Sequence, residues 1–457
     1  MSGFLKAGQS GISTGTIFKI AVPLIIQQFS GQLQIFADRA MLGHVNSEYF
    51  SAVGNATIPY YTVTSVIFAI CGGTTILVAQ NFGASDTTSC RRYAESSFMG
   101  NFILSLLCFA LFFFGSGLMF RLMGVESPIL EYSESFLRII SFTLIGMGIT
   151  FTAVSLMQGV GRTKIIMITG AVANILNIFL DWCLIFGNLG FPRLGIEGAA
   201  YATLISNFAA APIILIYVFV SRNIPVRLRF RNVFRFHWRA YKTVLKLGAP
   251  AVLESALWNV GNLIVISFLN RLNIMAVGIY TLIFSLELLP MLIYTGFANA
   301  ALTLVGHKTG ADAHEHAVSI GFQCLRLSLL VCVVVALLFL TLPKELLGIF
   351  TNDRSMVEYA APFLMLIAAS MFPRSVNNVI GPGIRGMGDT RWMLYGQIGG
   401  TALVIALAYA LIFPAGLGLW GLFLAFLVDE TIRGFINLMR FWKGREVFRL
   451  KPFKKIS

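Results

Sequence analysis

Acidic side chains inside long apolar runs are the first candidates for chemistry in this sequence. Asp38 lies near the end of the apolar run 17–42, and Asp181 lies near the end of the run 163–187. An ionised carboxylate at the centre of a membrane span costs about 2.5–3.5 kcal/mol on insertion scales. A residue kept at that cost is a functional candidate by default, so both carboxylates call for a chemical explanation.

The depth of these residues along their helices is predicted to bring them together. If successive spans alternate in direction, Asp38 and Asp181 both precede the outer ends of their spans by a few residues. Thr203 follows the outer start of the run 196–221 by a similar distance. At a rise of about 1.5 Å per residue, all three side chains fall about 6–11 Å below the outer boundary. Asn177 precedes Asp181 by one helical turn and therefore shares its helix face.

Two carboxylates, an amide oxygen and a hydroxyl are the hard oxygen ligands that a small cation prefers. Neighbouring carboxylates do not both stay ionised without a counter-charge, so a cation or a proton must lie between them. The alternative is an ion pair between Asp38 and Arg39, with Asp181 hydrogen-bonded inside the bundle. Adjacent helix residues diverge by about 100°, which makes that ion pair geometrically poor. The pattern therefore predicts a cation or proton site at Asp38, Asn177, Asp181 and Thr203, with no catalytic residue and no metal beyond Na⁺.

Other ionisable residues lie in later apolar runs. Glu254 follows Pro250 by one helical turn, and Glu287 lies in the run 275–306. Each has a role in substrate binding or coupling, or is a hydrogen-bonded structural carboxylate. Asp429 and Glu430 have a role in transport, or Asp429 is neutralised by Arg433, which follows it by four residues on the same helix face.

Pro23 lies in the same apolar run as Asp38. A proline inside a helix removes one backbone hydrogen bond and permits a bend. Such a bend would move Asp38 between two states, and the alternative is a static kink.

The composition indicates a protein that crosses a membrane many times. The 457 residues are 57% hydrophobic and only 12% charged, with a mean hydropathy of +0.79. Soluble domains have about a quarter charged residues. The six cysteines contain no CxxC pair, so neither a zinc site nor a disulfide framework is indicated. No nucleotide-binding or hydrolase motif occurs, so we expect no cofactor other than a coupling ion and no enzymatic activity.

Twelve runs are long enough to cross a bilayer as helices, which need about 20 apolar residues each. We expect an all-α membrane protein without a removable signal peptide. The expected spans are 17–42, 50–80, 93–119, 133–158, 163–187, 196–221, 241–270, 275–306, 316–342, 356–383, 391–413 and 417–440.

The basic residues predict the orientation. Most of the 34 lysines and arginines fall on the side that holds both termini, so both are expected in the cytoplasm. The orientation of the protein in the membrane and its attraction to anionic lipid explain why basic residues gather on that side. Nucleic-acid binding is therefore not expected. We expect location in the cell (inner or plasma) membrane.

The chain repeats itself at an offset of 227 residues, which places six spans in each half. An even number of spans gives both halves the same orientation, related by a pseudo-two-fold axis along the membrane normal. The expected parts are a six-helix lobe over 1–221, a basic linker over 222–246, a second lobe over 247–440 and a basic tail over 441–457. The matched segments are Pro23 with Pro250, 77–84 with 304–311, 159–164 with 386–391, and 184–186 with 411–413.

These motifs together resemble the multidrug and toxic compound extrusion (MATE) family over about residues 17–440. The motifs are AVPLIIQQFSGQLQIFADRAMLGH, LVAQNFGA, QGVGRTK, LVGHKTGA and RGMGDTR. The resemblance implies an antiporter that expels amphipathic, often cationic organic compounds in exchange for inward Na⁺ or H⁺, and we expect a monomer in contact with lipid. The sequence is most similar to the prokaryotic DinF-like branch, whose cation-site pattern falls on Asp38, Asn177, Asp181 and Thr203.

The sequence leaves two alternatives to an efflux antiporter open. A flippase for lipid-linked precursors, from the same superfamily, would need a large and more cationic cleft. A membrane-embedded enzyme would change a lipid chemically without any ion gradient. The acidic site in the first half argues against the flippase, and the duplicated six-helix lobes argue against the enzyme.

Overall fold

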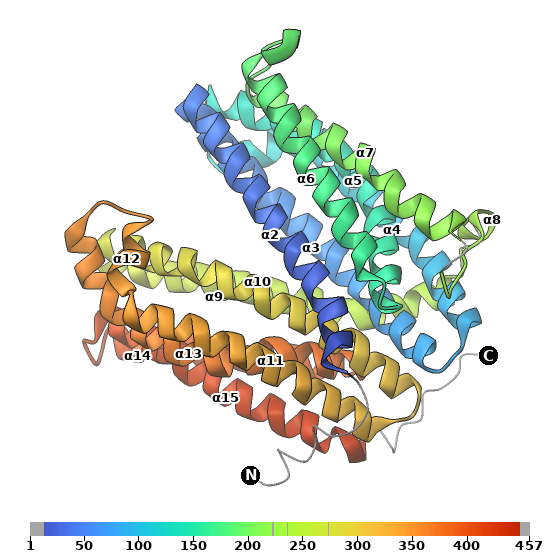
Figure 1. Cartoon of the computed structure of the whole chain (residues 1–457). Helices are drawn as coiled ribbons and strands as arrows, with labels where there is room; N and C mark the ends of the chain where they lie inside the picture. The colour runs from blue at the N-terminus through green and yellow to red at the C-terminus, as the bar shows by residue number, and fades with distance from the viewer. Residues whose placement is uncertain (1–12, 222–223, 235, 273, 448–457) are drawn as a thin grey trace. The chain divides into compact units, whose positions relative to one another are not determined.

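The computed structural model describes residues 13–221, 224–234, 236–272 and 274–447. Within these residues, a long helix occupies each of the predicted apolar runs, and its ends lie within a few residues of the predicted ones (Figure 1). The first half contains α2 (Thr14–Val45), α3 (Ser47–Gly83), α4 (Thr87–Leu122), α5 (Ile129–Gly159), α6 (Thr163–Phe186) and α7 (Ile196–Val220), and the second contains α9 (Trp238–Leu272), α10 (Ile274–Gly310), α11 (His314–Thr341), α13 (Arg354–Gly386), α14 (Thr390–Ile412) and α15 (Gly418–Val447). Short elements are η1 (Asn188–Gly190), α8 (Phe230–Val233) and α12 (Pro343–Gly348).

Most of these helices have the length and hydropathy of membrane spans. In the described part of the chain, 10 helices qualify alone, and α10, bent by 45° beside Pro290, brings the number to 11. The remaining long helix, α15, carries Asp429, Glu430 and Arg433 close together. These charged residues take part in ion pairs within the second half of the chain. The chain is therefore a multi-pass membrane protein.

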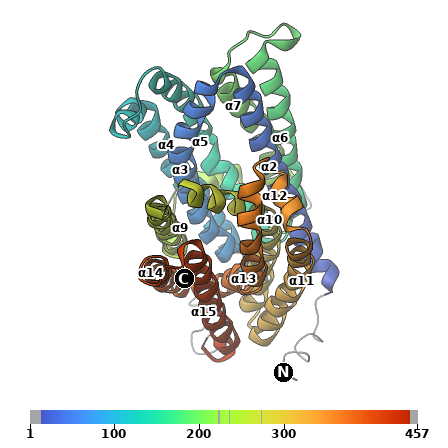
Figure 2. The ribbon, with the colours of Figure 1, turned by 90° about the vertical axis from the view of Figure 1, so that its left-hand side faces the viewer.

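The two halves pack in the same pattern, as the sequence repeat predicts. In the first half α5 contacts α3, α4 and α7, and α6 pairs with α7. In the second half α13 contacts α10, α11 and α15, and α14 pairs with α15 (Figures 1 and 2). Each half also has its own apolar core, one centred on α3 and α5 and the other on α10 and α13.

Glycines of the repeated G-x-G motif fix one helix crossing in each half. A Cβ atom on Gly386 of α13 would lie 2.6 Å from the backbone oxygen of Leu302 in α10. Gly159 occupies the equivalent position in the first half. A Cβ atom on Gly159 would lie 3.1 Å from the backbone oxygen of Thr75 in α3. The second glycine of the motif, Gly388, has φ +93°, a conformation that side chains with a Cβ rarely adopt. The motif thus sets helix contact and the turn that follows.

The chain divides into two compact units that do not coincide with the halves of the sequence. One unit contains residues 22–249, and the other contains 1–21 together with 250–457. Both divisions fall beside a proline, Pro23 in α2 and Pro250 in α9, and both helices continue through their prolines. The first turns of each helix therefore belong to the unit built by the other half of the chain. The predicted lobes 1–221 and 247–440 stay predictions.

Parts of the predicted basic linker and of the predicted basic tail are helical. Residues 238–246, expected in the linker, form the first turns of α9, and the segment before them contains α8. The helix α15 continues to Val447, so residues 441–447 of the predicted tail are helical. Residues 448–457 lie outside the described residues.

We expect Gly386→Ala to lower the stability of the purified protein by about 1–3 kcal/mol, because the new methyl group overlaps backbone that does not rotate away. Thermal unfolding in detergent measures the effect. Gly399→Ala is the matched control, since nothing lies within 4 Å of a Cβ atom there. Equal unfolding temperatures for the two variants would show that the α10–α13 crossing is not as tight as described.

Candidate functional site

The predicted cation-site residues meet in the unit that contains residues 22–249. Asp38 of α2 and Asp181 of α6 have their carboxyl groups within hydrogen-bonding reach of each other. Gln34, one turn before Asp38, donates to Asp38 Oδ2 over 3.2 Å. Asp181 is fully buried, and its Oδ1 atom has no hydrogen-bond partner in the described part of the chain. The structure therefore brings the two carboxyl groups together, as the depth argument predicted.

Asn177 and Thr203 complete the same group. With the Asn177 amide turned so that both of its ends are satisfied, its nitrogen donates to Asp38 Oδ1 over 3.1 Å and to Asp181 Oδ2 over 3.3 Å. Its oxygen then accepts from the Thr203 backbone nitrogen over 3.2 Å. In the opposite orientation, the amide nitrogen faces the Thr203 hydroxyl at 3.3 Å. In either orientation, the Asn177 side chain lies between two neighbours: the Asp38 and Asp181 carboxyl groups on one side and Thr203 of α7 on the other.

No basic side chain neutralises this acidic pair. Among the described residues, neither Asp38 nor Asp181 forms an ion pair, and the alternative of a bond between Asp38 and Arg39 is wrong. Two carboxylates in contact repel each other unless a positive charge lies between them. A shared proton or a small cation between the two carboxyl groups would remove this repulsion.

A row of polar contacts between α2 and α6 leads to the acidic pair, and the sequence analysis missed it. Asn174, one turn before Asn177, donates to the Ser30 hydroxyl over 2.8 Å. One turn earlier, the side chain of Gln27 lies against Gly170, where a Cβ atom would come within 2.8 Å of it. Polar residues spaced three to four apart on both helices are the signal that could have revealed this face.

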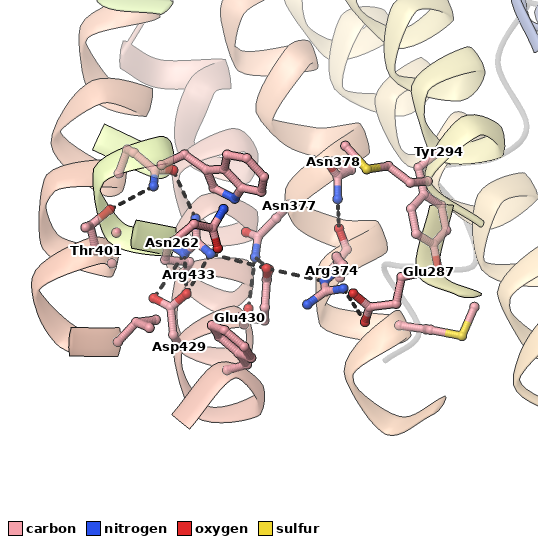
Figure 3. Close-up of a pocket in the computed structure, with 18 of the residues that line it drawn as sticks. Asn262, Glu287, Tyr294, Arg374, Asn377, Asn378, Thr401, Asp429, Glu430 and Arg433 are labelled. Atoms are coloured by element: carbon pink, nitrogen blue, oxygen red, sulfur yellow. Dashed lines mark hydrogen bonds and ion pairs between the residues drawn. The ribbon is translucent and has the colours of Figure 1, made fainter. Parts of the chain in front are cut away.

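The second unit holds a larger group of charged side chains. Arg374 of α13 lies between Glu287 of α10, at 2.6 Å, and Glu430 of α15, at 3.5 Å (Figure 3). Arg433 contacts Asp429 at 2.6 Å and Glu430 at 3.2 Å. Glu430 thus accepts from both arginines, and the group has one more carboxylate than guanidinium.

Amide side chains join this charged network into one structure. Asn377 donates to Glu430 Oε2 over 2.6 Å, and Asn437 donates to Asn377 Oδ1 over 3.0 Å. Gln397 accepts from Arg433 over 3.2 Å. The predicted pairing of Asp429 with Arg433 is present, but it is one contact in a network that also involves α10 and α13.

The network borders a cavity of about 310 Å³. Its apolar wall includes Tyr280 of α10, which lies 6.3 Å from Phe284 and 6.4 Å from Phe426 between ring centres. The Tyr280 hydroxyl donates to Asn262 over 3.2 Å.

Glu254 has a partner that the sequence did not predict. It is 8% exposed, and Arg385 of α13 forms an ion pair with it. This pair joins the early part of α9 to the end of α13, which is the arrangement expected of a structural carboxylate. The wider cavity also has Glu254 and Arg385 in its wall.

Comparison with known proteins gives one consistent result. The MatE family model matches residues 23–183 and again residues 250–410. A probable multidrug resistance protein NorM from Thermotoga maritima is 27% identical over 449 residues, covering 96% of each chain. A multidrug export protein MepA from Staphylococcus saprophyticus is 25% identical and covers 90% of each chain. A solved structure of a MATE protein in complex with MaD3S superimposes with a TM-score of 0.89 at 19% identity, over 99% of this chain and 100% of that one. A MOP superfamily transporter from Pyrococcus furiosus gives 0.88 at 18% identity, over 98% and 99%.

We expect Arg374→Gln to destabilise the protein by about 3–5 kcal/mol, because it leaves the mostly buried Glu287 carboxyl group without its ion-pair partner. The double variant Arg374→Gln/Glu287→Gln should recover much of this loss. Thermal unfolding of the purified variants measures both effects. Arg354→Gln, at the exposed start of the same helix, is the control and should leave the unfolding temperature unchanged. An Arg374→Gln protein as stable as the control would contradict the described ion pair.

Proposed function

The chain belongs to the MatE family of multidrug and toxic compound extrusion transporters, and on that premise we propose how it couples cargo export to an ion gradient. The relatives from Thermotoga maritima and Staphylococcus saprophyticus, which match this chain over nearly their whole length, are named as a probable multidrug resistance protein and a multidrug export protein. The chain is a multidrug efflux transporter that works as an antiporter. Its cargo is a class of small organic compounds, and cation coupling is general in the family.

The coupling site in this proposal is the group formed by Asp38, Asn177, Asp181 and Thr203. The observation that carries it is the contact of two carboxyl groups without a basic partner, one of them fully buried. Such a pair holds a proton or a Na⁺ ion tightly and changes its charge when that ion leaves. When Na⁺ is bound, the Asn177 amide takes the orientation in which its nitrogen donates to the Thr203 hydroxyl, so that its oxygen lies on the side of the carboxyl groups. That amide oxygen and the Thr203 hydroxyl oxygen are the further ligands for Na⁺ in this proposal.

The exchange then follows from electrostatics. When the site is empty it is anionic and attracts a cationic or amphipathic cargo from the cytoplasm. Entry of a proton or Na⁺ from the outside neutralises the carboxyl groups, so the cargo loses that attraction and is released. Opening toward the cytoplasm frees the ion and restores the negative charge. A bend at Pro23, on the helix that carries Asp38, is the proposed source of movement.

Glu287 belongs to a second part of the proposal. It forms one edge of the cavity beside Tyr280, where the carboxylates exceed the arginines by one. We assign this cavity to the passage of organic cations. Glu254 has a structural role here, because Arg385 already neutralises it. A flippase that holds a pyrophosphate would need a net positive cavity, which neither group of residues provides.

We further propose that the protein lies in the cell membrane as a monomer, with both termini in the cytoplasm. The basic residues on that side support the orientation. A cysteine-accessibility assay on residues of the connection between α7 and α9, in intact cells, tests it directly. Labelling of that connection by an impermeant reagent added outside would reverse the topology.

Asp181→Asn is the sharpest test of the coupling site. We expect gradient-driven export from sealed vesicles to fall at least tenfold, while the unfolding temperature stays equal or rises, because the amide fills the same space without the charge repulsion. Na⁺ and H⁺ gradients imposed separately identify the coupling ion. Glu345→Gln, an exposed carboxylate on α12, is the control for a lost charge.

Unchanged export by the Asp181→Asn variant would remove the acidic pair from the mechanism. Asn177→Ala separates the two ions further. If Na⁺ is the coupling ion, the concentration of Na⁺ needed for half-maximal export rises, because an oxygen ligand is lost. If a proton is the coupling ion, the response to a pH gradient persists.

A further inference from the structure

A cavity of about 450 Å³ lies in the unit of residues 22–249, where α7 ends and the connecting segment to α9 begins. Its wall is formed by the start of α4, the end of α7 and the extended chain before α8. The lining residues are Arg91, Phe219, Val220, Arg227, Leu228 and Arg229. The transport proposal uses none of them.

The guanidinium groups at this cavity lack acidic partners. Among the described residues, no ion pair and no side-chain hydrogen bond involves Arg91, Arg227 or Arg229. The Nε atom of Arg91 is also buried, so water does not replace the missing acceptor. Buried donors without acceptors are rare in folded proteins, and each one calls for an explanation. Arginine groups that converge without a counter-charge are typical of a site for phosphate.

The connecting segment presents its arginines in a fixed direction. Residues 224–229 are not helical, and their side chains alternate between buried and exposed. Ile224, Val226 and Leu228 are at most 5% exposed, whereas Arg227 and Arg229 are exposed on the opposite side. The buried residues anchor the segment, which holds both arginines at the cavity.

Aromatic contacts attach this segment to the helices beside it. Phe219 of α7 lies 5.6 Å from Phe98 of α4 and 5.6 Å from Phe230 of α8, between ring centres. The helix α8 also packs against α4 (Figure 1). The arginines from α4 and from the connecting segment are therefore parts of one packed structure.

The outer wall of the cavity continues into a lipid-facing surface. Val220 lines the cavity and is 70% exposed, and Ile216, one turn earlier on α7, is 60% exposed. Exposed apolar residues on a membrane span are in contact with acyl chains. A ligand with a phosphate and an adjoining hydrocarbon part fits this combination, whereas a soluble phosphate would use only the arginines.

We propose that this cavity binds the phosphate of an anionic phospholipid on the cytoplasmic side of the membrane. Arg91, Arg227 and Arg229 hold the headgroup, and the acyl chains lie along Ile216 and Val220 of α7. Basic residues beside a span attract anionic lipid in general. The proposal is more specific, because it assigns the binding to one packed cavity and not to the overall charge of the connecting segment.

Native mass spectrometry of the full-length protein in detergent, with phosphatidylglycerol or phosphatidylcholine added, tests the proposal. We expect retained phosphatidylglycerol in the parent protein and at least about tenfold weaker retention in Arg227→Gln/Arg229→Gln. Arg231→Gln/Arg239→Gln removes the same charge from α8 and the first turn of α9, outside the cavity, and should retain the lipid like the parent. Arg91→Lys, which keeps the charge but lacks Nε, should bind more weakly than the parent.

Three outcomes would overturn the proposal. One is equal loss of lipid in the two double variants, which would reduce the effect to general charge attraction. Another is equal retention of phosphatidylcholine, which would remove the role of the anionic headgroup. The third is protection against thermal unfolding by inorganic phosphate but not by phosphatidylglycerol, which would assign the cavity to a soluble anion. Ion-driven export, measured in parallel, keeps this test separate from that of the coupling site.

Discussion

A carboxylate inside a membrane span needs a positive charge beside it, and the two units of this protein meet that need differently. In the second unit, Glu287 forms an ion pair with Arg374, and Glu430 forms one with Arg433. In the first unit, Asp38 and Asp181 have only each other and neutral amides. A carboxylate that has an arginine beside it is neutralised within the protein. A carboxyl pair without such a partner is neutralised when a proton or a cation binds, and this difference supports the proposal that Asp38 and Asp181 form the coupling site.

The sequence repeat shows which residues of one half occupy the positions of the charged residues of the other half. Shifted by 227 residues, the positions of Asp38 and Asp181 fall on Val265 and Ala408, which belong to the apolar core of the second unit. In the other direction, Glu287 falls on Tyr60 and Arg374 falls on Met147. The halves keep the same helix packing and the same close glycine contacts, while their polar residues occupy different positions. One scaffold thus supports an acidic pair in one half and a mixed-charge cavity in the other.

Much of this structure is predictable from the sequence, and the remainder has a clear physical reason. Hydropathy fixes the helices, and depth alone places Asp38 and Asp181 at one level. The depth of a residue along its membrane span does not predict how the helix is rotated about its axis. It also does not predict which helix, distant in the sequence, the residue faces. The partners of Glu254 and Glu287 depend on both, because Arg385 and Arg374 are on α13, far along the chain. The polar row between α2 and α6 was accessible from its spacing, since its residues repeat every turn.

The exchange of first turns between the units has an evolutionary consequence. Residues 1–21 group with the second half and residues 238–249 with the first, so the boundary passes through helices and not through a loop. If an ancestral six-helix chain paired with a copy of itself in this way, the first turns of each copy's first helix would have packed in the other copy. That is a domain-swapped homodimer, an assembly that needs no new interface chemistry. Gene fusion would then have joined the two copies in one chain and kept the exchanged first turns in place. After fusion, the charged residues of the two halves were able to evolve independently.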